Sequence, residues 1–313
     1  MDRETGGSVK RTTSLRHLIA QPDILVLPGV HDALGARIAE QAGFHAVVSG
    51  GYSATATLLG QPDSSQLSYT EMLDYYARLC EATSLPVFSD ADTGYGGTTN
   101  VARTVRGYER AGVAALLLED QVFPKRCGHF PGKTVIPVRD YIAKLKAALD
   151  ARTDPDLIIA ARTDALAVHG IDAAIERMQL AREAGADLLF IDALETPGQM
   201  RRFCIESGGP CLASVIEGGR TPLLSAAQLS EIGFAAVLFA LSATYAFARA
   251  LRDVYSVLSR DGSTAAITDR MASFSEFNEI VGLSAVRARE AELDAYADKV
   301  VTGRAGNIVS NEV

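Results

Sequence analysis

The sequence lacks an excess of basic residues and any long apolar run, and both absences narrow the class of protein. Its 313 residues include 30 Lys and Arg against 38 Asp and Glu, which gives a formal net charge of −8 at pH 7. Nucleic acids and anionic membranes bind basic faces, so we expect neither as a partner. No run approaches the roughly 18 apolar residues of a membrane helix. The charged start, MDRETGGSVKRTTSLRHL, has no apolar core of the kind that marks a secretory signal.

The sequence also lacks paired cysteines. It has four, and no two of them have the C-x-x-C spacing of a metal or redox motif: Cys80, Cys127, Cys204 and Cys211. Free thiols are the usual state in a reducing cytosol, so the cysteines predict a cytoplasmic protein.

Hydrophobic residues make up 48% of the chain, enough for a full core, and a repeated pattern organises them. In four places a helical pattern ends in glycine, which adopts a left-handed cap without a Cβ clash, and an apolar run follows; the glycines are Gly43, Gly112, Gly185 and Gly233. Proline is tolerated at a strand start, and four further apolar runs follow Pro22, Pro86, Pro155 and Pro210. Together these runs predict eight strands, near residues 24–29, 45–49, 86–90, 114–119, 157–162, 188–192, 211–215 and 235–240.

Amphipathic helical patterns such as TTNVARTVRGYERAG fill the gaps between these strands. Strand–helix alternation repeated eight times in a chain of this length predicts an α/β fold, a (β/α)₈ barrel of the TIM type. No G-x-G-x-x-G follows the first strand, which disfavours a dinucleotide-binding sheet. We assign residues 1–12 to a disordered N-terminus, 13–263 to the barrel, 264–298 to further C-terminal helices and 299–313 to a loose tail.

Acidic residues gather where the third and fourth predicted strands end. In a barrel enzyme the active site lies at the carboxyl ends of the strands. The acidic set there is Asp90, Asp92, Glu119 and Asp120. Packed carboxylates repel one another, and a hard divalent cation such as Mg²⁺ relieves the conflict, although acidic residues also cap helices. We predict a metal site at Asp90, Asp92 and Glu119.

Other polar residues at strand ends suit an anionic substrate. Ser49-Gly50-Gly51 offers backbone N–H groups with little side chain in the way, and Tyr52 follows them. A tight turn would explain the same glycines. Arg162 ends an apolar strand and needs an anionic partner, either a substrate or a neighbouring carboxylate. The sixth and seventh strands add Asp192, Ser214 and Glu217 to the same rim.

A polar loop, QVFPKRCGHFPGK at residues 121–133, leaves the fourth strand beside the acidic set. Lys125, Arg126 and His129 surround Cys127, and neighbouring cations lower the pKa of a thiol. A buried structural cysteine is the usual alternative, and it does not suit a charged loop. We predict that Cys127 is a reactive thiol and that its three neighbours belong to the catalytic group.

Five stretches resemble the isocitrate lyase and phosphoenolpyruvate mutase superfamily: SGG at 49–51, DADTGYGG at 90–97, LEDQVFPKRCGH at 118–129, ARTDA at 161–165 and EGGRTP at 217–222. K-R-C-G-H is similar to the lyase branch, which includes 2-methylisocitrate lyase and 2,3-dimethylmalate lyase. The resemblance implies a Mg²⁺-dependent barrel, with Mn²⁺ as an alternative ion, and a homotetramer, a dimer of dimers whose C-terminal helices are exchanged between subunits.

The resemblance also implies a reaction and roles for residues. A small 2-hydroxy di- or tricarboxylate would lose its hydroxyl proton and break a C–C bond, giving pyruvate or a related keto acid. The other fragment would take a proton from Cys127. By position, Asp90, Asp92 and Glu119 would surround the metal, and Ser49, Gly50, Gly51 and Arg162 would hold the keto-acid carboxylate.

Three positions depart from the methylisocitrate lyase pattern. Asp192 stands where Glu is usual, Ser214 where Asn is usual, and Tyr245 where an Arg helps to bind the extra carboxylate. The lost cation puts a tricarboxylate substrate in doubt and leaves a smaller or more apolar one open.

Other functions stay open at this point. One alternative keeps the fold but performs phosphonate chemistry, as a phosphonomutase or phosphonopyruvate hydrolase. Another is an oxaloacetate decarboxylase or hydrolase. A third, of a different class, is a non-catalytic binding barrel.

Overall fold

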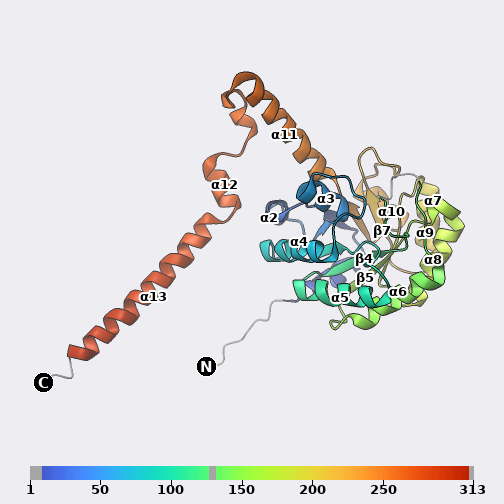
Figure 1. The fold of residues 1–313 in the computed structure, drawn as a ribbon, viewed down its shortest axis with the longest axis horizontal. Helices are drawn as coiled ribbons and strands as arrows, with labels where there is room; N and C mark the ends of the chain where they lie inside the picture. The colour runs from blue at the N-terminus through green and yellow to red at the C-terminus, as the bar shows by residue number, and fades with distance from the viewer. Residues whose placement is uncertain (1–8, 127–131, 310–313) are drawn as a thin grey trace. The chain divides into compact units, whose positions relative to one another are not determined.

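The structure, a computed structural model, describes residues 9–126 and 132–309. The chain divides between Arg249 and Ala250 into two compact units. The first contains all the strands of the described residues, and the second consists of helices. Figure 1 shows the chain and labels many of these elements. Within the described residues, no helix is both long and apolar enough to cross a membrane.

Parallel strands form the centre of the first unit. They are β1 (Leu25–Pro28), β2 (Val47–Ser49), β3 (Val87–Asp90), β4 (Ala115–Glu119), β5 (Ile158–Thr163), β6 (Leu188–Ile191), β7 (Leu212–Val215) and β8 (Ala236–Phe239). One sheet has the order β1-β8-β7 and the other the order β2-β3-β4-β5-β6. Single parallel bridges, Gly29 to Val48 and Leu189 to Cys211, join the two sheets and close the ring. The predicted α/β barrel and its eight strands are therefore confirmed.

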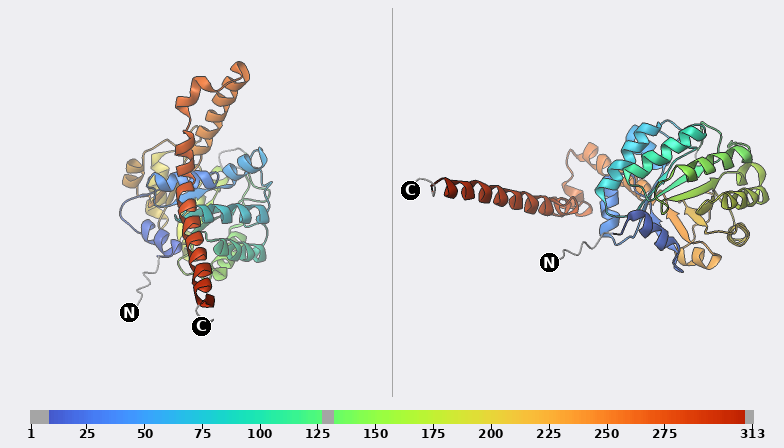
Figure 2. Two further views of the ribbon diagram at one scale, coloured as in Figure 1. Left: turned by 90° about the vertical axis from the view of Figure 1, so that its left-hand side faces the viewer. Right: turned by 90° about the horizontal axis from the view of Figure 1, so that it is seen from below.

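Helices surround these strands in the views of Figure 1 and Figure 2. They are α1 (Arg11–Ile19), α2 (Ala33–Gln41), α3 (Gly51–Leu59), α4 (Tyr69–Ala82), α5 (Thr98–Ala111), α6 (Val138–Ala151), α7 (Leu166–His169), α8 (Ile171–Glu183), α9 (Pro197–Glu206) and α10 (Ala226–Ile232). Helix α11 (Ser242–Asp261) begins in the first unit and ends in the second. Local sequence explains several boundaries. Ser68 starts α4 with a capping box, and Gly112 and Gly233 end α5 and α10 in the left-handed conformation that the sequence predicted.

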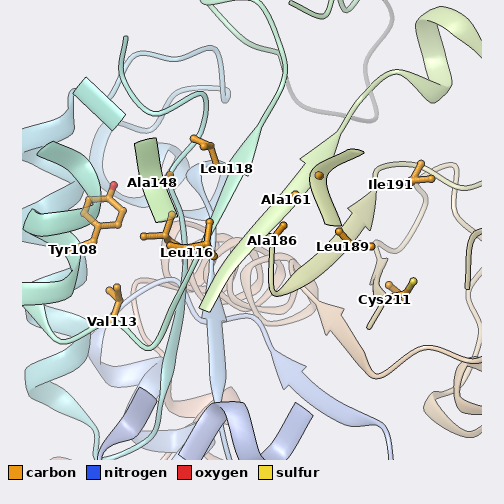
Figure 3. Close-up of a cluster of buried hydrophobic side chains, with 14 of the residues drawn as sticks. Tyr108, Val113, Leu116, Leu118, Ala148, Ala161, Ala186, Leu189, Ile191 and Cys211 are labelled. Carbon is orange, nitrogen blue, oxygen red and sulfur yellow. The ribbon is translucent and has the colours of Figure 1, made fainter. Parts of the chain in front are cut away.

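The strands separate two hydrophobic clusters because successive side chains point to opposite faces. Alternate residues such as Phe88, Leu117 and Phe190 fill the inside of the barrel, where Leu15 of α1 joins them. The intervening residues pack against the surrounding helices. Figure 3 shows part of this outer cluster, including Leu116 and Tyr108.

Two predicted boundaries need correction. The N-terminal segment was expected to be disordered through residue 12, but α1 begins at Arg11. The guanidinium of Arg11 donates to the Cys80 carbonyl at 2.6 Å, and the Thr12 hydroxyl donates to Asp154 at 2.9 Å, so both residues are anchored.

The C-terminal tail was expected to be loose from residue 299, but helix α13 (Leu283–Val309) continues to 309, and Figure 2 shows it uninterrupted. No proline lies in that stretch to stop backbone hydrogen bonding. The second unit also contains the end of α11, η1 (Ala265–Arg270) and α12 (Phe274–Ile280), so helices occupy most of the predicted segment 264–298.

Candidate active site

Alternation along the strands decides which polar side chains face into the barrel. On β4, Leu117 belongs to the inner cluster and Glu119 continues the same face, whereas Leu116 and Asp120 belong to the opposite face. The same two-residue period directs inward the groups Asp90, Arg162, Asp192 and Ser214. These four residues and Glu119 therefore meet at the carboxyl ends of the strands.

A cavity of about 90 Å³ lies at this end of the barrel, with room for several water molecules or a small ligand. Its two sides differ in chemistry. The charged lining residues lie either on strands of the five-stranded sheet or in the segments that connect them: Asp63, Asp90, Lys125, Arg162 and Asp192. Strands β7 and β8 line it with small or apolar groups, namely Ser214, Ile216, Leu238, Ala240 and Leu241. One side of the cavity is therefore charged and the other is largely apolar.

The glycine turn between β2 and α3 packs directly against the acidic side chains. The N–H of Gly51 donates to Asp90 Oδ2 at 3.2 Å. A Cβ at Gly51 would lie 3.2 Å from Asp92 Oδ1 and 3.3 Å from Lys125 Nζ. The Ser49 hydroxyl is already occupied, since it lies 2.7 Å from both the Val30 carbonyl and the Tyr75 hydroxyl. This turn can therefore offer a ligand its backbone rather than the serine side chain.

Asp90, Asp92 and Glu119 lie on the charged side of the site. Asp92 adopts a left-handed conformation, with φ of 46°, and such strain is frequent at functional sites. Burial raises the pKa of Asp92 to about 6, against the opposing charge of Lys125. Burial also raises the pKa of Glu119 well above its usual value, against Arg162 and Lys125. Neither carboxylate oxygen of Glu119 accepts a hydrogen bond from the described residues.

These carboxylates fit a hydrated divalent cation. A cation would stabilise the ionised forms of Asp92 and Glu119, which burial disfavours, and would bind the Glu119 oxygens, which accept no hydrogen bond from the described residues. Within residues 9–126 and 132–309, no three His, Cys, Asp or Glu side chains converge closely enough to hold an ion directly. Mg²⁺ commonly keeps several waters and binds through one or two carboxylates, which suits this arrangement.

Lys125 is the residue of the predicted catalytic group that the structure brings into the site. Its side chain is 3% exposed, and Nζ lies 2.7 Å from Asp63 and 2.9 Å from Asp92. Burial opposes its charge, but the surrounding carboxylates, with Asp92 the strongest, raise the pKa of Lys125 well above its usual value. Lys125 is therefore a fixed cation beside the acidic set.

Asp63 is a site residue that the sequence did not predict. It lies between α3 and α4, far along the chain from any strand end, so inspection of strand ends could not find it. Both its ion pair with Lys125 and its place in the cavity lining depend on the fold of that connection.

Asp120 was predicted as part of the acidic set, but the structure places it on the other face of β4. It faces outward and accepts hydrogen bonds from the Thr163 hydroxyl at 2.6 Å, the Asp164 N–H at 2.9 Å and Arg177 at 3.0 Å. Adjacent residues on a strand point to opposite faces, so Glu119 and Asp120 cannot both enter the barrel. Asp120 joins β4, β5 and α8 instead.

Arg162 is enclosed by carboxylates. Its Nε lies 3.0 Å from Asp164 and 3.2 Å from Glu119, and Nη2 lies 3.5 Å from Asp192. Its guanidinium also lies 5.6 Å from the centre of the Phe190 ring. Burial opposes ionisation of Asp164, but Arg162 and Lys133 outweigh it and lower the pKa of Asp164 to about 2.

Several predicted residues lie elsewhere. Arg126 is exposed, and its backbone pairs with the Gln121 side chain. Glu217 accepts a hydrogen bond from Ser242 and is not among the described residues that line the cavity. Tyr245 is 38% exposed and meets the edge of Tyr52, a lining residue, with ring centres 6.5 Å apart.

Two residues of the predicted catalytic group, Cys127 and His129, lie outside the described residues.

Comparisons with known proteins agree with this geometry. The family model described as phosphoenolpyruvate phosphomutase matches residues 15–258. The 2,3-dimethylmalate lyase of Eubacterium barkeri is 44% identical over 276 residues, which cover 88% of this chain and 96% of the relative.

Two solved structures have the same fold. A crystal structure of 2,3-dimethylmalate lyase, described as a member of the PEP mutase/isocitrate lyase superfamily, matches with a TM-score of 0.86 at 36% identity. The match covers 92% of this chain and 96% of that one. Phosphonopyruvate hydrolase, in complex with oxalate and Mg²⁺, matches with a TM-score of 0.82 at 30% identity, over 90% of this chain and 99% of that one. The chain therefore belongs to the phosphoenolpyruvate phosphomutase family, within the PEP mutase/isocitrate lyase superfamily.

Proposed function

We propose that this protein is a carbon–carbon lyase that cleaves a 2-hydroxy dicarboxylate carrying alkyl groups, and that it releases pyruvate or a related keto acid. The relative that is 44% identical and one solved structure with a TM-score of 0.86 are both named 2,3-dimethylmalate lyase. These names support a lyase over the phosphonate and oxaloacetate alternatives.

The different chemistry of the two sides of the cavity indicates which substrate the protein accepts. Its cations, Lys125 and Arg162, both lie on the charged side, where a keto-acid carboxylate would bind. Ile216, Leu238 and Leu241 form the other side, and among the described residues none there is positively charged. A third carboxylate would lose its hydration on that side without a partner, whereas alkyl groups gain from burial. This favours a dimethylmalate-like substrate over a tricarboxylate.

Each group on the charged side has a role in this proposal. Asp90, Asp92 and Glu119 would hold Mg²⁺ or Mn²⁺, partly through water, and the ion would stabilise negative charge on the substrate oxygens. The glycine turn and Arg162 would hold the keto-acid carboxylate. A base takes the hydroxyl proton, and the C2–C3 bond breaks with its electron pair left on C3. From the sequence we propose Cys127 as the acid that then protonates C3.

A substrate panel tests this function. The protein, supplied with Mg²⁺, is incubated separately with 2,3-dimethylmalate, 2-methylisocitrate, oxaloacetate and phosphonopyruvate, and the products are identified by NMR. We expect pyruvate and propionate from dimethylmalate and the highest kcat/KM with that substrate. A higher kcat/KM with 2-methylisocitrate would refute the argument that the apolar side of the cavity excludes a third carboxylate. Turnover of phosphonopyruvate alone would refute the proposed lyase activity.

The role of Cys127 is tested on the accepted substrate. General acid catalysis typically contributes about 10²- to 10⁴-fold, so we expect Cys127→Ser to lower kcat by at least about 10²-fold. Unchanged turnover would remove the thiol from the mechanism.

We also propose a cytoplasmic homotetramer. The cysteines described, Cys80, Cys204 and Cys211, are free thiols, as is usual in a reducing compartment. The second unit leaves large apolar side chains exposed, including Phe274 at 87% and Tyr296 at 69%. Such surface is typical of an interface, which supports exchange of these helices between subunits. Light scattering coupled to size exclusion should give the mass of four chains, and a monomer would refute the assembly.

A further inference from the structure

The guanidinium of Arg162 has more carboxylates around it than one cation can neutralise. Asp164 takes two hydrogen bonds from it, at 3.0 and 3.2 Å, and Glu119 and Asp192 lie within 3.5 Å. All three carboxylate side chains are 5% exposed or less. Buried carboxylates without balancing charge are costly and would repel a substrate carboxylate.

Lys133 supplies a second buried cation beside two of these carboxylates, Asp164 and Asp192. Its Nζ lies 2.7 Å from Asp164 and 3.5 Å from Asp192, and its side chain is 2% exposed. Arg162 and Lys133 together balance Asp164 and Asp192, which leaves Glu119 as the uncompensated carboxylate. Glu119 is the residue whose oxygens lack hydrogen-bond partners in the described structure and that we assign to the metal.

The backbone around Lys133 is fixed by pairing with the segment that leaves β4. Val122 N–H donates to the Thr134 carbonyl at 2.9 Å, and Ile136 N–H donates to the Asp120 carbonyl at 2.8 Å. Gln121 and Val135 form an antiparallel bridge between these two contacts. The pairing with the segment after β4 therefore fixes the backbone position from which the Lys133 side chain reaches Asp164 and Asp192.

Arg162 keeps one nitrogen for a ligand. Its hydrogen bonds within residues 9–126 and 132–309 use Nε and Nη2, and none uses Nη1. The distances to Glu119 and Asp192 given above are also from Nε and Nη2. Arg162 lines the cavity, whereas Lys133 is not among the described residues that do. Lys133 thus reaches the site through Asp164 and Asp192, which hold the guanidinium in place.

We propose that Lys133 is a positioning residue: it neutralises Asp164 and Asp192, so that Arg162 keeps its orientation and presents Nη1 to the substrate carboxylate. The inference rests on the proposed function only in taking a carboxylate as the ligand. According to this inference, Lys133 contributes to the affinity for the substrate carboxylate although it does not line the cavity.

Lys133→Met tests this, because methionine keeps an unbranched side chain and removes the charge. Lys133→Arg keeps the charge, and Lys146→Met, which removes an exposed lysine paired with Asp150, is the matched control. The affinity for oxalate in the presence of Mg²⁺ is measured by calorimetry, and kcat and KM are measured on the accepted substrate. Residues that orient a binding group typically change affinity or activity by about 10- to 100-fold.

We expect Lys133→Met to weaken oxalate binding and raise KM by about 10- to 100-fold. Lys133→Arg should recover most of the affinity, and Lys146→Met should match the unmodified protein. If Lys133→Met does not fold, Lys133→Gln, which removes the charge but keeps a polar side chain that can donate to Asp164, is measured instead.

Oxalate binding by Lys133→Met, or by Lys133→Gln where that variant replaces it, as tight as in the unmodified protein would overturn the inference. So would absence of oxalate binding in the unmodified protein, because Arg162 would then have no carboxylate ligand. If the unmodified protein binds oxalate but cleaves no 2-hydroxy acid, the proposed function fails while the role of Lys133 is still decided by the oxalate affinities.

Discussion

Replacing Gly51 with alanine should damage the site without damaging the fold. The added Cβ would lie 3.2 Å from Asp92 Oδ1, 3.3 Å from Lys125 Nζ and 3.6 Å from Asp63 Oδ1. The first two distances are shorter than ordinary contacts, so the neighbours must move by a few tenths of an ångström. Those neighbours are the ion-paired side chains on the charged side of the cavity.

The backbone itself accepts the change. Gly51 is the first residue of α3 and is not among the glycines with positive φ. Alanine in place of a helical glycine stabilises by up to about 1 kcal/mol, which is up to about 4 °C in Tm for a domain of this size. Activity should move the other way, because a misplacement of about 1 Å can lower the rate by about 10²-fold. For the smaller shift here we expect kcat/KM to fall by about 10- to 100-fold, or about 1.4–2.7 kcal/mol of transition-state stabilisation.

Steady-state kinetics and thermal unfolding, measured on the same preparations, separate the two effects. Gly198→Ala is the control, since Gly198 also lies in the first turn of a helix, α9, and its added Cβ would meet only Thr196 Oγ1, at 3.8 Å. That variant should keep full activity. Gly51→Ala with kcat/KM within twofold of the unmodified protein would show that the close approach of the glycine turn to the ion pairs has no catalytic importance.

Three further predictions concern stability and metal binding. The Tyr76 hydroxyl lies 2.8 Å from the Asp90 N–H and 3.1 Å from its carbonyl, so Tyr76→Phe should lower the free energy of unfolding by about 1–3 kcal/mol in urea titrations; an unchanged midpoint would contradict this. Asp120→Asn should lower the free energy of unfolding by about 3 kcal/mol by removing the charge opposite Arg177, but should leave Mg²⁺ affinity unchanged; the reverse result would make Asp120 a metal ligand. The raised pKa of Asp92, about 6 against a usual 3.8, means that its protonation favours folding at low pH and that this contribution is lost as pH rises through about 6. Mg²⁺ requires the ionised form, so its effect on Tm should be larger near pH 7.5 than near pH 5; equal effects would argue against Asp92 as a ligand.

The barrel could be predicted because its determinants are local. Gly112 and Gly233 mark helix ends that the structure shows in the left-handed conformation. The apolar runs after them are strands buried on both faces, a pattern that needs no knowledge of distant residues. The boundary error at Arg11 has another cause. Arg11 is helical because it contacts the Cys80 carbonyl, 69 residues away, and such a contact leaves no trace in the local pattern.

The charged side of the site was predictable for a related reason. A two-residue period and the barrel rule place Asp90, Glu119 and Arg162 together at one rim, and the structure brings them there. The ion pairs were not predictable, because they depend on residues outside the strands. Asp63 reaches Lys125 from the connection between α3 and α4, across 62 residues of sequence.

For the apolar side of the cavity, the sequence showed only that some residues depart from the family pattern. Ser214 does line the cavity, while Tyr245 meets the edge of the lining residue Tyr52. The sequence could indicate a lost cation there but not which groups replaced it, since Ile216 and Leu241 carry no chemical signal of their own. Cys127 and His129 lie outside the described residues, so their roles stay predictions.

The two single bridges that close the barrel also mark the boundary between the strands with the charged lining and the strands with the largely apolar lining. Between Gly29 and Val48 on one side, and between Leu189 and Cys211 on the other, the continuous hydrogen bonding of the ladder is interrupted. The five strands from β2 to β6 carry the charged lining of the cavity, and β7 and β8, in the three-stranded sheet, carry the largely apolar lining. Substitutions in the smaller sheet can therefore reshape the selectivity of the pocket while the ionic framework keeps its register. A barrel divided in this way can accept new substrates through changes in β7 and β8, while the charged residues that perform the reaction stay the same.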